Sequence, residues 1–144
     1  MSTALSHVGV CVSDVERSTR FYCEALGFEA AEAFDVGDEF GRLMELDSVQ
    51  LRSQFLRREG LAIELLSFSV PEPGGSKERR PMTQFGLTHL CFRVDDVEAV
   101  AAAVVEHGGT VHENTRTTLA DGVLDFVYCS DPDGVRLELM KTPS

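Results

Sequence analysis

The sequence predicts an α+β fold made of two tandem βαβββ modules, and an internal repeat is the main reason. When the chain is shifted by 82 positions, residues 5–16 lie over residues 87–98, and the identical positions include His, Val, Asp and Glu. At an offset of 74, residues 63–66 (Ile-Glu-Leu-Leu) lie over residues 137–140 (Leu-Glu-Leu-Met). The two matches occur in the same order, and the smaller offset indicates a shorter middle in the second copy. The chain is therefore interpreted as a duplication.

The first copy begins with a strand and a helix. Residues 5–12 are a short apolar run rich in β-branched residues, which predicts a strand. Ser13 and Asp14 offer a helix N-cap, helical periodicity follows up to Leu26, and Gly27 ends it. Four strand-like segments come next, at residues 28–35, 41–47, 49–57 and 61–68.

The second copy repeats this order. Residues 87–94 predict a strand, Asp95 or Asp96 caps a helix that runs through Val105, and Gly108 with Gly109 stops it. Strand-like segments follow at residues 110–115, 123–129 and 135–141. Residues 57–60 and 131–134 are interpreted as turns between strands, and each contains a glycine for a positive φ.

The domain organisation follows from the repeat. We expect a first module at residues 1–70, a linker at residues 71–82 and a second module at residues 83–144, all within one structural domain. The linker is rich in Pro and Gly, charged and without periodicity. It has two interpretations, an inert connection or a mobile flap over a site.

Composition narrows the function. The 144 residues are 43% hydrophobic and 26% charged, which is ordinary for a protein that buries a core, and the formal net charge of −11 disfavours nucleic acid and anionic membranes as partners. Anionic substrates are not excluded, because a bound dication and local arginines outweigh the distant field. The four cysteines lack a C-x-x-C spacing, and the first residues lack the pattern of a secretion signal. These features predict packed, reduced thiols and a cytoplasmic location.

Four candidate metal ligands stand at equivalent places in the repeat. His7 and His89 lie at the starts of the two modules, and Glu64 and Glu138 lie on their last strands. Taken singly, each Glu within apolar sequence either faces solvent or is buried with a partner. Two imidazoles and two carboxylates suit a divalent first-row metal, or Mg²⁺ with less help from nitrogen. Four protein ligands would leave two positions of an octahedron for water or substrate, as in a catalytic site.

Three motifs resemble a known family. They are the His7–Asp14 segment HVGVCVSD, the Phe21–Phe28 segment FYCEALGF and the Asp131–Leu139 segment DPDGVRLEL. Together they look like the vicinal oxygen chelate superfamily, which includes glyoxalase I, methylmalonyl-CoA epimerase, extradiol dioxygenases and antibiotic-sequestering proteins. The resemblance covers nearly the whole chain and implies that the two modules form an open, cup-shaped mixed sheet with the helices outside.

The resemblance also implies a metal at the floor of this cup, held by His7, Glu64, His89 and Glu138. The ion would be Ni, Co, Zn, Mn, Fe or Mg. The implied reaction is that of a glyoxalase-like lyase or isomerase on a small carbonyl substrate, through a metal-stabilised enolate. Glu138 is the first candidate for the base, with Glu64 as its counterpart, and the alternative for either is a permanent ligand.

Other activities stay open at this stage. An acyl-CoA epimerase typically carries Gln at the position of Glu64 and a carboxylate on the preceding strand, and residues 49–56 contain no acid. An extradiol-type dioxygenase would need one carboxylate fewer. A metal-assisted binding or resistance protein is the non-enzymatic alternative. The expected partners are a small-molecule substrate and a second copy in a homodimer, which would cover sheet edges. Four arginines could grip a carboxylate or phosphate or simply lie on the surface: Arg20, Arg42, Arg52 and Arg116.

Overall fold

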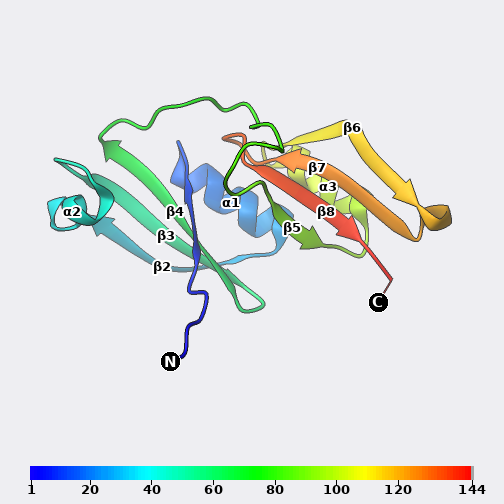
Figure 1. The fold of residues 1–144 in the computed structure, drawn as a ribbon, viewed down its shortest axis with the longest axis horizontal. Coiled ribbons are helices and arrows are strands. Elements are labelled where there is room, and N and C mark those ends of the chain that lie inside the picture. Colours follow the sequence, from blue (N-terminus) through cyan, green and yellow to red (C-terminus); the bar gives the residue numbers. More distant parts are fainter. Residues whose placement is uncertain (144) are drawn as a thin grey trace. The chain divides into compact units, whose positions relative to one another are not determined.

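The computed structural model describes residues 1–143 and divides into two compact units. Unit 1 comprises residues 1–23 and 27–75, and unit 2 comprises residues 24–26 and residues from Ser76 onward. Each unit contains one four-stranded sheet (Figure 1). In the described part of the chain, no helix has the length and apolar character needed to cross a membrane.

The first sheet has the strand order β1-β4-β3-β2. Strands β1 and β4 are parallel, whereas β3 pairs antiparallel with both β4 and β2. The elements in chain order are β1 (Val8–Cys11), α1 (Val15–Leu26), β2 (Glu29–Val36), the 3-10 helix η1 (Asp38–Phe40), α2 (Gly41–Met44), β3 (Gln50–Arg58) and β4 (Leu61–Val70).

The second sheet repeats this topology in the order β5-β8-β7-β6, again with its first and last strands parallel. Unit 2 therefore has the same order of elements as unit 1: one strand, one long helix and three further strands. The prediction of two tandem βαβββ modules with open, mixed sheets is confirmed. The elements are β5 (Leu90–Arg93), α3 (Val97–Glu106), β6 (Thr110–Leu119), the 3-10 helix η2 (Ala120–Gly122), β7 (Leu124–Ser130) and β8 (Arg136–Lys141).

Both long helices begin at an aspartate. The side chain of Asp14 accepts a hydrogen bond from the backbone N–H of Arg17 at 3.0 Å, and that of Asp96 accepts one from Ala99 at 3.1 Å. Each carboxylate satisfies a backbone donor that a helix leaves unpaired in its first turn. Gly27 ends α1 with φ 74°, a left-handed conformation that glycine adopts at little cost.

The predicted strand at residues 41–47 is wrong. This stretch forms α2 and a turn, in which Glu45 has φ 58° and the N–H of Leu46 donates to the carbonyl of Gly41 at 2.9 Å. A side chain at Gly41 would lie 2.7 Å from the carbonyl oxygen of Leu46, so this close turn requires glycine. The carboxylate of Asp38 then accepts the N–H of Val49 at 2.8 Å. These local hydrogen bonds outweigh the weak strand preference of the segment.

Along the last strand of each module, side chains alternate between the buried core and the face that carries the candidate metal ligand. In β8, Leu137 and Leu139 are fully buried, and α3 packs against β6, β7 and β8. Glu138 lies between the two leucines and therefore faces the other side of the sheet. In β4, Ile63 and Leu65 are fully buried in the same way on either side of Glu64. Each candidate glutamate is thus half-buried on the face opposite its core neighbours.

Candidate metal centre

Unit 1 brings together the two ligands predicted for it. His7 directly precedes β1, and its Nε2 atom lies 3.7 Å from Oε1 of Glu64 on the adjacent strand β4. The hydroxyl of Ser6 lies 2.9 Å from Nδ1 of His7 and fixes the other side of the ring. The ring of Phe55 meets the imidazole edge to face, with centroids 5.2 Å apart.

Unit 2 contains the equivalent arrangement. Nε2 of His89 lies 2.8 Å from Oε2 of Glu138, and the hydroxyl of Thr88 lies 2.8 Å from Nδ1 of His89. The ring of Tyr128 occupies the place of the phenylalanine, with its centroid 5.5 Å from that of His89. Tyr128 and Glu138 are direct cross-strand partners, as are Phe55 and Glu64. The duplication has therefore kept the hydroxyl, the imidazole, the carboxylate and the aromatic ring together.

This arrangement fits metal binding. A hydroxyl at Nδ1 fixes the orientation of the imidazole, and Nε2 is then the atom that faces the carboxylate. Ligand atoms about 2.1 Å from one ion lie about 3 Å apart at neighbouring coordination positions. The separations of 3.7 Å and 2.8 Å between nitrogen and oxygen are close to that value. Each pair can therefore serve as two adjacent ligands of a divalent ion.

Each unit supplies two of the four predicted ligands. Among residues 1–143, His, Cys, Asp and Glu side chains do not gather in any group of three or more that could hold a metal. A site that uses all four residues, His7, Glu64, His89 and Glu138, stays a prediction.

The surroundings of the two carboxylates differ. The buried hydroxyl of Ser53 donates a hydrogen bond to Oε2 of Glu64 at 2.7 Å. Glu138 instead lies beside Cys91, its cross-strand partner, and burial together with the negative charge of Glu138 raises the pKa of that thiol to about 11. The thiol of Cys91 is therefore protonated at neutral pH. Thiols are weak hydrogen-bond donors, so among the described residues Glu138 has no hydroxyl donor like Ser53, although its contact with His89 at 2.8 Å is shorter than that of Glu64 with His7 at 3.7 Å.

The cysteines only partly follow the prediction of packed thiols. Cys129 is fully buried, and burial is the main cause that raises its pKa to about 11. Cys11 and Cys91 are exposed instead, because they occupy the outward positions of the short parallel strands β1 and β5.

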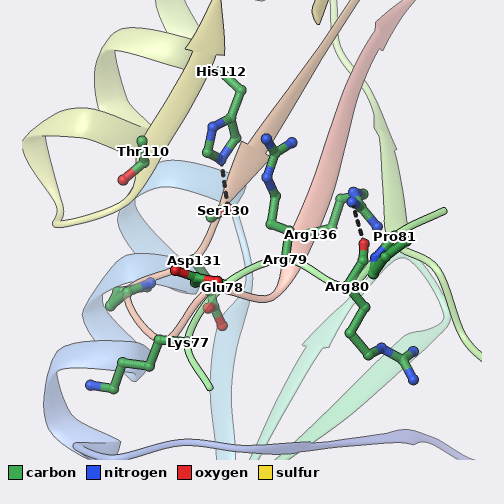
Figure 2. Close-up of a pocket in the computed structure, with 12 residues that line it drawn as sticks. Lys77, Glu78, Arg79, Arg80, Pro81, Thr110, His112, Ser130, Asp131 and Arg136 are labelled. Carbon is green, nitrogen blue, oxygen red and sulfur yellow. Dashed lines mark hydrogen bonds between the residues drawn. The ribbon is translucent and has the colours of Figure 1, made fainter. Parts of the chain in front are cut away.

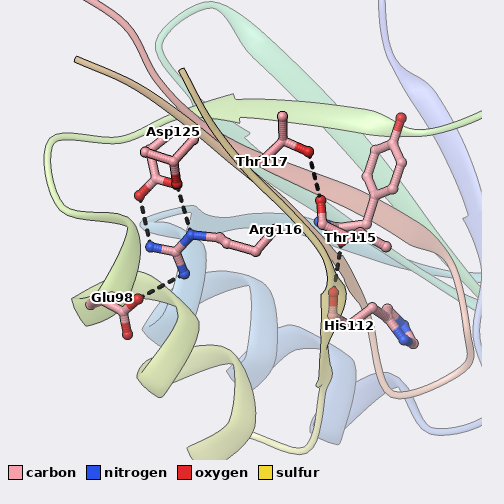
Figure 3. A network of polar contacts seen from close by, with 8 residues as sticks. Glu98, His112, Thr115, Arg116, Thr117 and Asp125 are labelled. Carbon is pink, nitrogen blue, oxygen red and sulfur yellow. Dashed lines mark hydrogen bonds and ion pairs between the residues drawn. The ribbon is translucent and has the colours of Figure 1, made fainter. Parts of the chain in front are cut away.

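Two of the arginines proposed as anion contacts have structural partners. Arg116 donates to both carboxylate oxygens of Asp125 at 2.7 Å and lies 2.7 Å from Oε1 of Glu98, so it links β6, β7 and α3 (Figure 3). Arg52 pairs with Asp35 at 3.0 Å on an exposed part of β3. A substrate would have to compete with these carboxylates.

The structure instead shows a pocket that the sequence did not predict. It lies in unit 2 between the linker and strands β6 to β8, and its lining includes Arg79, His112, Ser130 and Arg136 (Figure 2). Strand alternation could have identified Arg136, which is two residues before Glu138 and shares its face. Arg79 carries no such pattern, because it belongs to the aperiodic linker.

Comparison with known proteins agrees with this architecture. A 2-epi-5-epi-valiolone epimerase from Actinomyces sp is 26% identical over 99% of this chain and 81% of that protein. The lactoylglutathione lyase of Schizosaccharomyces pombe is 26% identical over 97% of this chain and 48% of its own length. A glyoxalase family protein from Bacillus cereus has the same fold, with a TM-score of 0.85 at 18% identity over 100% of this chain and 97% of that chain.

The family assignment rests on the full length of the two modules. Residues 4–139 match the profile of the Glyoxalase/Bleomycin resistance protein/Dioxygenase superfamily, and this range includes both His and Glu pairs. The chain therefore belongs to the Glyoxalase/Bleomycin resistance protein/Dioxygenase superfamily.

Proposed function

We propose that this protein is a divalent-metal-dependent lyase or isomerase of glyoxalase type that moves a proton on the carbon next to a carbonyl group. The observation that carries the proposal is the repeated His–Glu pair, in which a neighbouring hydroxyl holds Nδ1 and Nε2 faces the carboxylate. Similarity to an epimerase and to a lactoylglutathione lyase supports proton transfer as the common chemistry.

The four predicted ligands would bind and position the metal ion. His7, Glu64, His89 and Glu138 would hold the ion; His7 is exposed and the other three are partly buried, so the donor atoms are within reach of a substrate. A bound divalent ion supplies Lewis acidity that polarises the carbonyl and stabilises an enolate. The aromatic rings of Phe55 and Tyr128 pack against the imidazoles and support their orientation.

We infer that Glu138 is the base and Glu64 the permanent ligand. The hydrogen bond from Ser53 holds one oxygen of Glu64 in place. Within the described chain, no hydroxyl donates to Glu138, and the neighbouring Cys91 thiol is a weaker donor. A carboxylate that must accept a proton from carbon and return it has to move away from the ion, and no such hydroxyl among residues 1–143 restrains Glu138 as Ser53 restrains Glu64.

Epimerisation is the second candidate, favoured by the similarity to an epimerase over nearly the whole chain. It would use two groups that exchange protons with opposite faces of one carbon, and Glu64 and Glu138 are the available pair. Proton NMR in D₂O separates the two reactions. An epimerase exchanges deuterium into a substrate of both configurations, whereas a lyase or isomerase converts the carbonyl compound into a different product.

Metal analysis of protein purified without chelator is the direct test. We expect bound divalent metal in the wild type and loss of most of it in His7→Ala, Glu64→Gln, His89→Ala and Glu138→Gln, with the circular dichroism spectrum retained. His107→Ala is the matched control, because His107 only ends α3. Metal content that is indifferent to all four substitutions would overturn the proposal.

We further propose that the protein works as a homodimer in the cytoplasm, acting on a small molecule. A second copy would cover exposed apolar side chains such as Phe34, Phe40 and Leu43. Light scattering after size-exclusion chromatography should give twice the mass of one chain. A monomer at micromolar concentration would contradict the proposed homodimer.

A further inference from the structure

The pocket in unit 2 is a cavity of about 520 Å³, which is large enough for a small organic molecule. The linker segment 77–81 forms one wall, and residues of β6, β7, β8 and the turn before β8 form the other (Figure 2). The pocket is separate from the predicted ligands, because neither His89 nor Glu138 lines it.

The linker wall is attached to the sheet at three points. The carbonyl oxygen of Lys77 lies only 1.8 Å from the place where a side chain at Gly134 would begin, so the linker backbone packs directly on this glycine. The ammonium of Lys77 lies 3.3 Å from Asp133. Arg136 donates a hydrogen bond to the carbonyl of Arg80 at 2.6 Å. These contacts build a defined wall from an aperiodic segment.

Two guanidinium groups in the pocket have no acidic partner. Within residues 1–143, neither Arg79 nor Arg136 forms an ion pair with a carboxylate. Arg136 donates only to the backbone carbonyls of Arg80 and Thr88, and its buried Nε atom has no hydrogen-bond partner. Such an uncompensated pair of positive charges is unexpected in a chain with a formal net charge of −11.

The other charged groups of the pocket are already engaged. Lys77 pairs with Asp133, and Arg80 donates to the carbonyl of Leu87. The carboxylate of Asp131 accepts the backbone N–H groups of Asp133 and Val135 at 2.9 Å and 2.8 Å. Hydrogen bonds to neutral backbone groups leave these charges in place, so the lining keeps three cations besides Lys77, namely Arg79, Arg80 and Arg136, against the two carboxylates Glu78 and Asp131. Glu78 is exposed and lies toward Lys77 and Asp131, away from His112, in Figure 2.

Neutral hydrogen-bonding groups stand beside these arginines. Nε2 of His112 lies 2.7 Å from the hydroxyl of Ser130, and the side chain of Arg79 lies beside this imidazole (Figure 2). Burial, followed by the charges of Arg79 and Arg136, lowers the pKa of His112. The imidazole is therefore neutral at pH 7 and adds hydrogen-bonding capacity without charge.

We propose that this pocket binds the phosphate group of a small organic molecule. Two guanidinium groups match the charge of about −2 and the several acceptor oxygens of a phosphate monoester, whereas a carboxylate would compensate only one of them. Ser130 and His112 supply further polar contacts at the same end of the pocket.

The pocket also adjoins the candidate metal ligands of its own unit. Arg136 and Glu138 lie two residues apart on the same face of β8, and the guanidinium of Arg136 stands 5.6 Å over the ring of Tyr128, which in turn contacts His89. The phosphate therefore belongs to the substrate, a small phosphorylated carbonyl compound. This second step rests on the proposed function.

Calorimetric titration of the chelator-treated 144-residue chain with inorganic phosphate tests the pocket without any metal. We expect saturable binding that is about tenfold or more weaker in Arg79→Gln and in Arg136→Gln. Arg93→Gln removes the same charge from an exposed position at the end of β5 and should bind like the wild type. If Arg136→Gln does not fold, Arg79→Gln decides, because its side chain makes no structural hydrogen bond within residues 1–143.

Three outcomes would overturn the phosphate site: no saturable binding, an equal loss in Arg93→Gln, or acetate binding as tightly as phosphate. The Glu138→Gln variant separates this inference from the proposed function, since it should lose metal but keep phosphate binding. If phosphate does not bind but metal content still depends on Glu138, the phosphate pocket alone is refuted. Phosphate binding with metal content indifferent to the four ligand substitutions would refute the catalytic proposal and the substrate role.

Discussion

At the scale of single residues, Ser53 is the feature that distinguishes the two candidate half-sites. Its buried hydroxyl donates to Glu64 at 2.7 Å, and such outer contacts orient a ligand carboxylate. We expect Ser53→Ala to weaken metal binding about tenfold and to lower the free energy of unfolding by about 1 kcal/mol. Competition with a chromophoric chelator and urea denaturation measure the two effects.

Ser18 provides the matched control for this substitution. It is also fully buried, but its hydroxyl has no hydrogen-bond partner among the described residues. Ser18→Ala should therefore leave metal affinity unchanged and should not lower stability. Wild-type metal affinity in Ser53→Ala would contradict an orienting role for Ser53.

At the scale of secondary-structure elements, Arg116 joins helix α3 to the second sheet. Its contacts with Glu98 and Asp125 are largely shielded from solvent at the arginine, whose side chain is 22% exposed. We expect Arg116→Gln to lower the free energy of unfolding by about 1–2 kcal/mol. Arg52→Gln removes an exposed ion pair with Asp35 and should cost less than about 0.5 kcal/mol.

The stabilisation that Arg116 provides should decrease in acid. The hydrogen bond from Arg116 is the main cause that lowers the pKa of Asp125 below its ordinary value of 3.8. A lowered pKa in the folded state stabilises the protein above the ordinary pKa, and this contribution is lost as the pH falls through the lower folded value. The stability difference between wild type and Arg116→Gln should therefore be constant near neutral pH and shrink below about pH 3.8. A difference that grows in acid would contradict it.

Gly134 is the point at which the turn before β8 holds the linker. Alanine there would have φ 93° and would also collide with the carbonyl of Lys77. We expect Gly134→Ala to displace the linker wall and reduce phosphate binding, while metal content stays unchanged. Gly60→Ala separates strain from collision, because Gly60 has φ 81° and nothing within 4 Å of the added carbon. Equal phosphate affinity in the two variants would show that the collision does not matter.

At the scale of the whole molecule, the proposed metal site makes stability depend on metal. The four proposed ligands are distant in sequence and would bind the ion only in the folded chain, so metal at a hundred times its Kd should add about 2.7 kcal/mol to the free energy of unfolding. For a chain of this size, that raises the Tm by several degrees. Calorimetric scans of wild type and Glu138→Gln with and without metal measure this, and an equal Tm shift in the variant would exclude Glu138 as a ligand.

Much of the fold and part of the site follow from sequence patterns that act over short distances. The repeat identified the module order, Asp14 and Asp96 are the caps that their positions indicate, and strand alternation puts Glu64 and Glu138 opposite the buried leucines and isoleucine. The strand predicted at residues 41–47 was wrong, because the turn there depends on a close backbone approach at Gly41 and on a hydrogen bond from Val49 to Asp38.

The sequence by itself determined the βαβββ duplication and the pairing of each histidine with its glutamate, because periodicity and repetition express which side chains share a face. Only the tertiary structure decided what surrounds them. The hydrogen bond from Ser53 to Glu64 joins segments distant in sequence. The same is true of the packing of the linker on Gly134, which places Arg79 beside His112. Such contacts are set by packing in three dimensions, and a linear pattern carries no record of them.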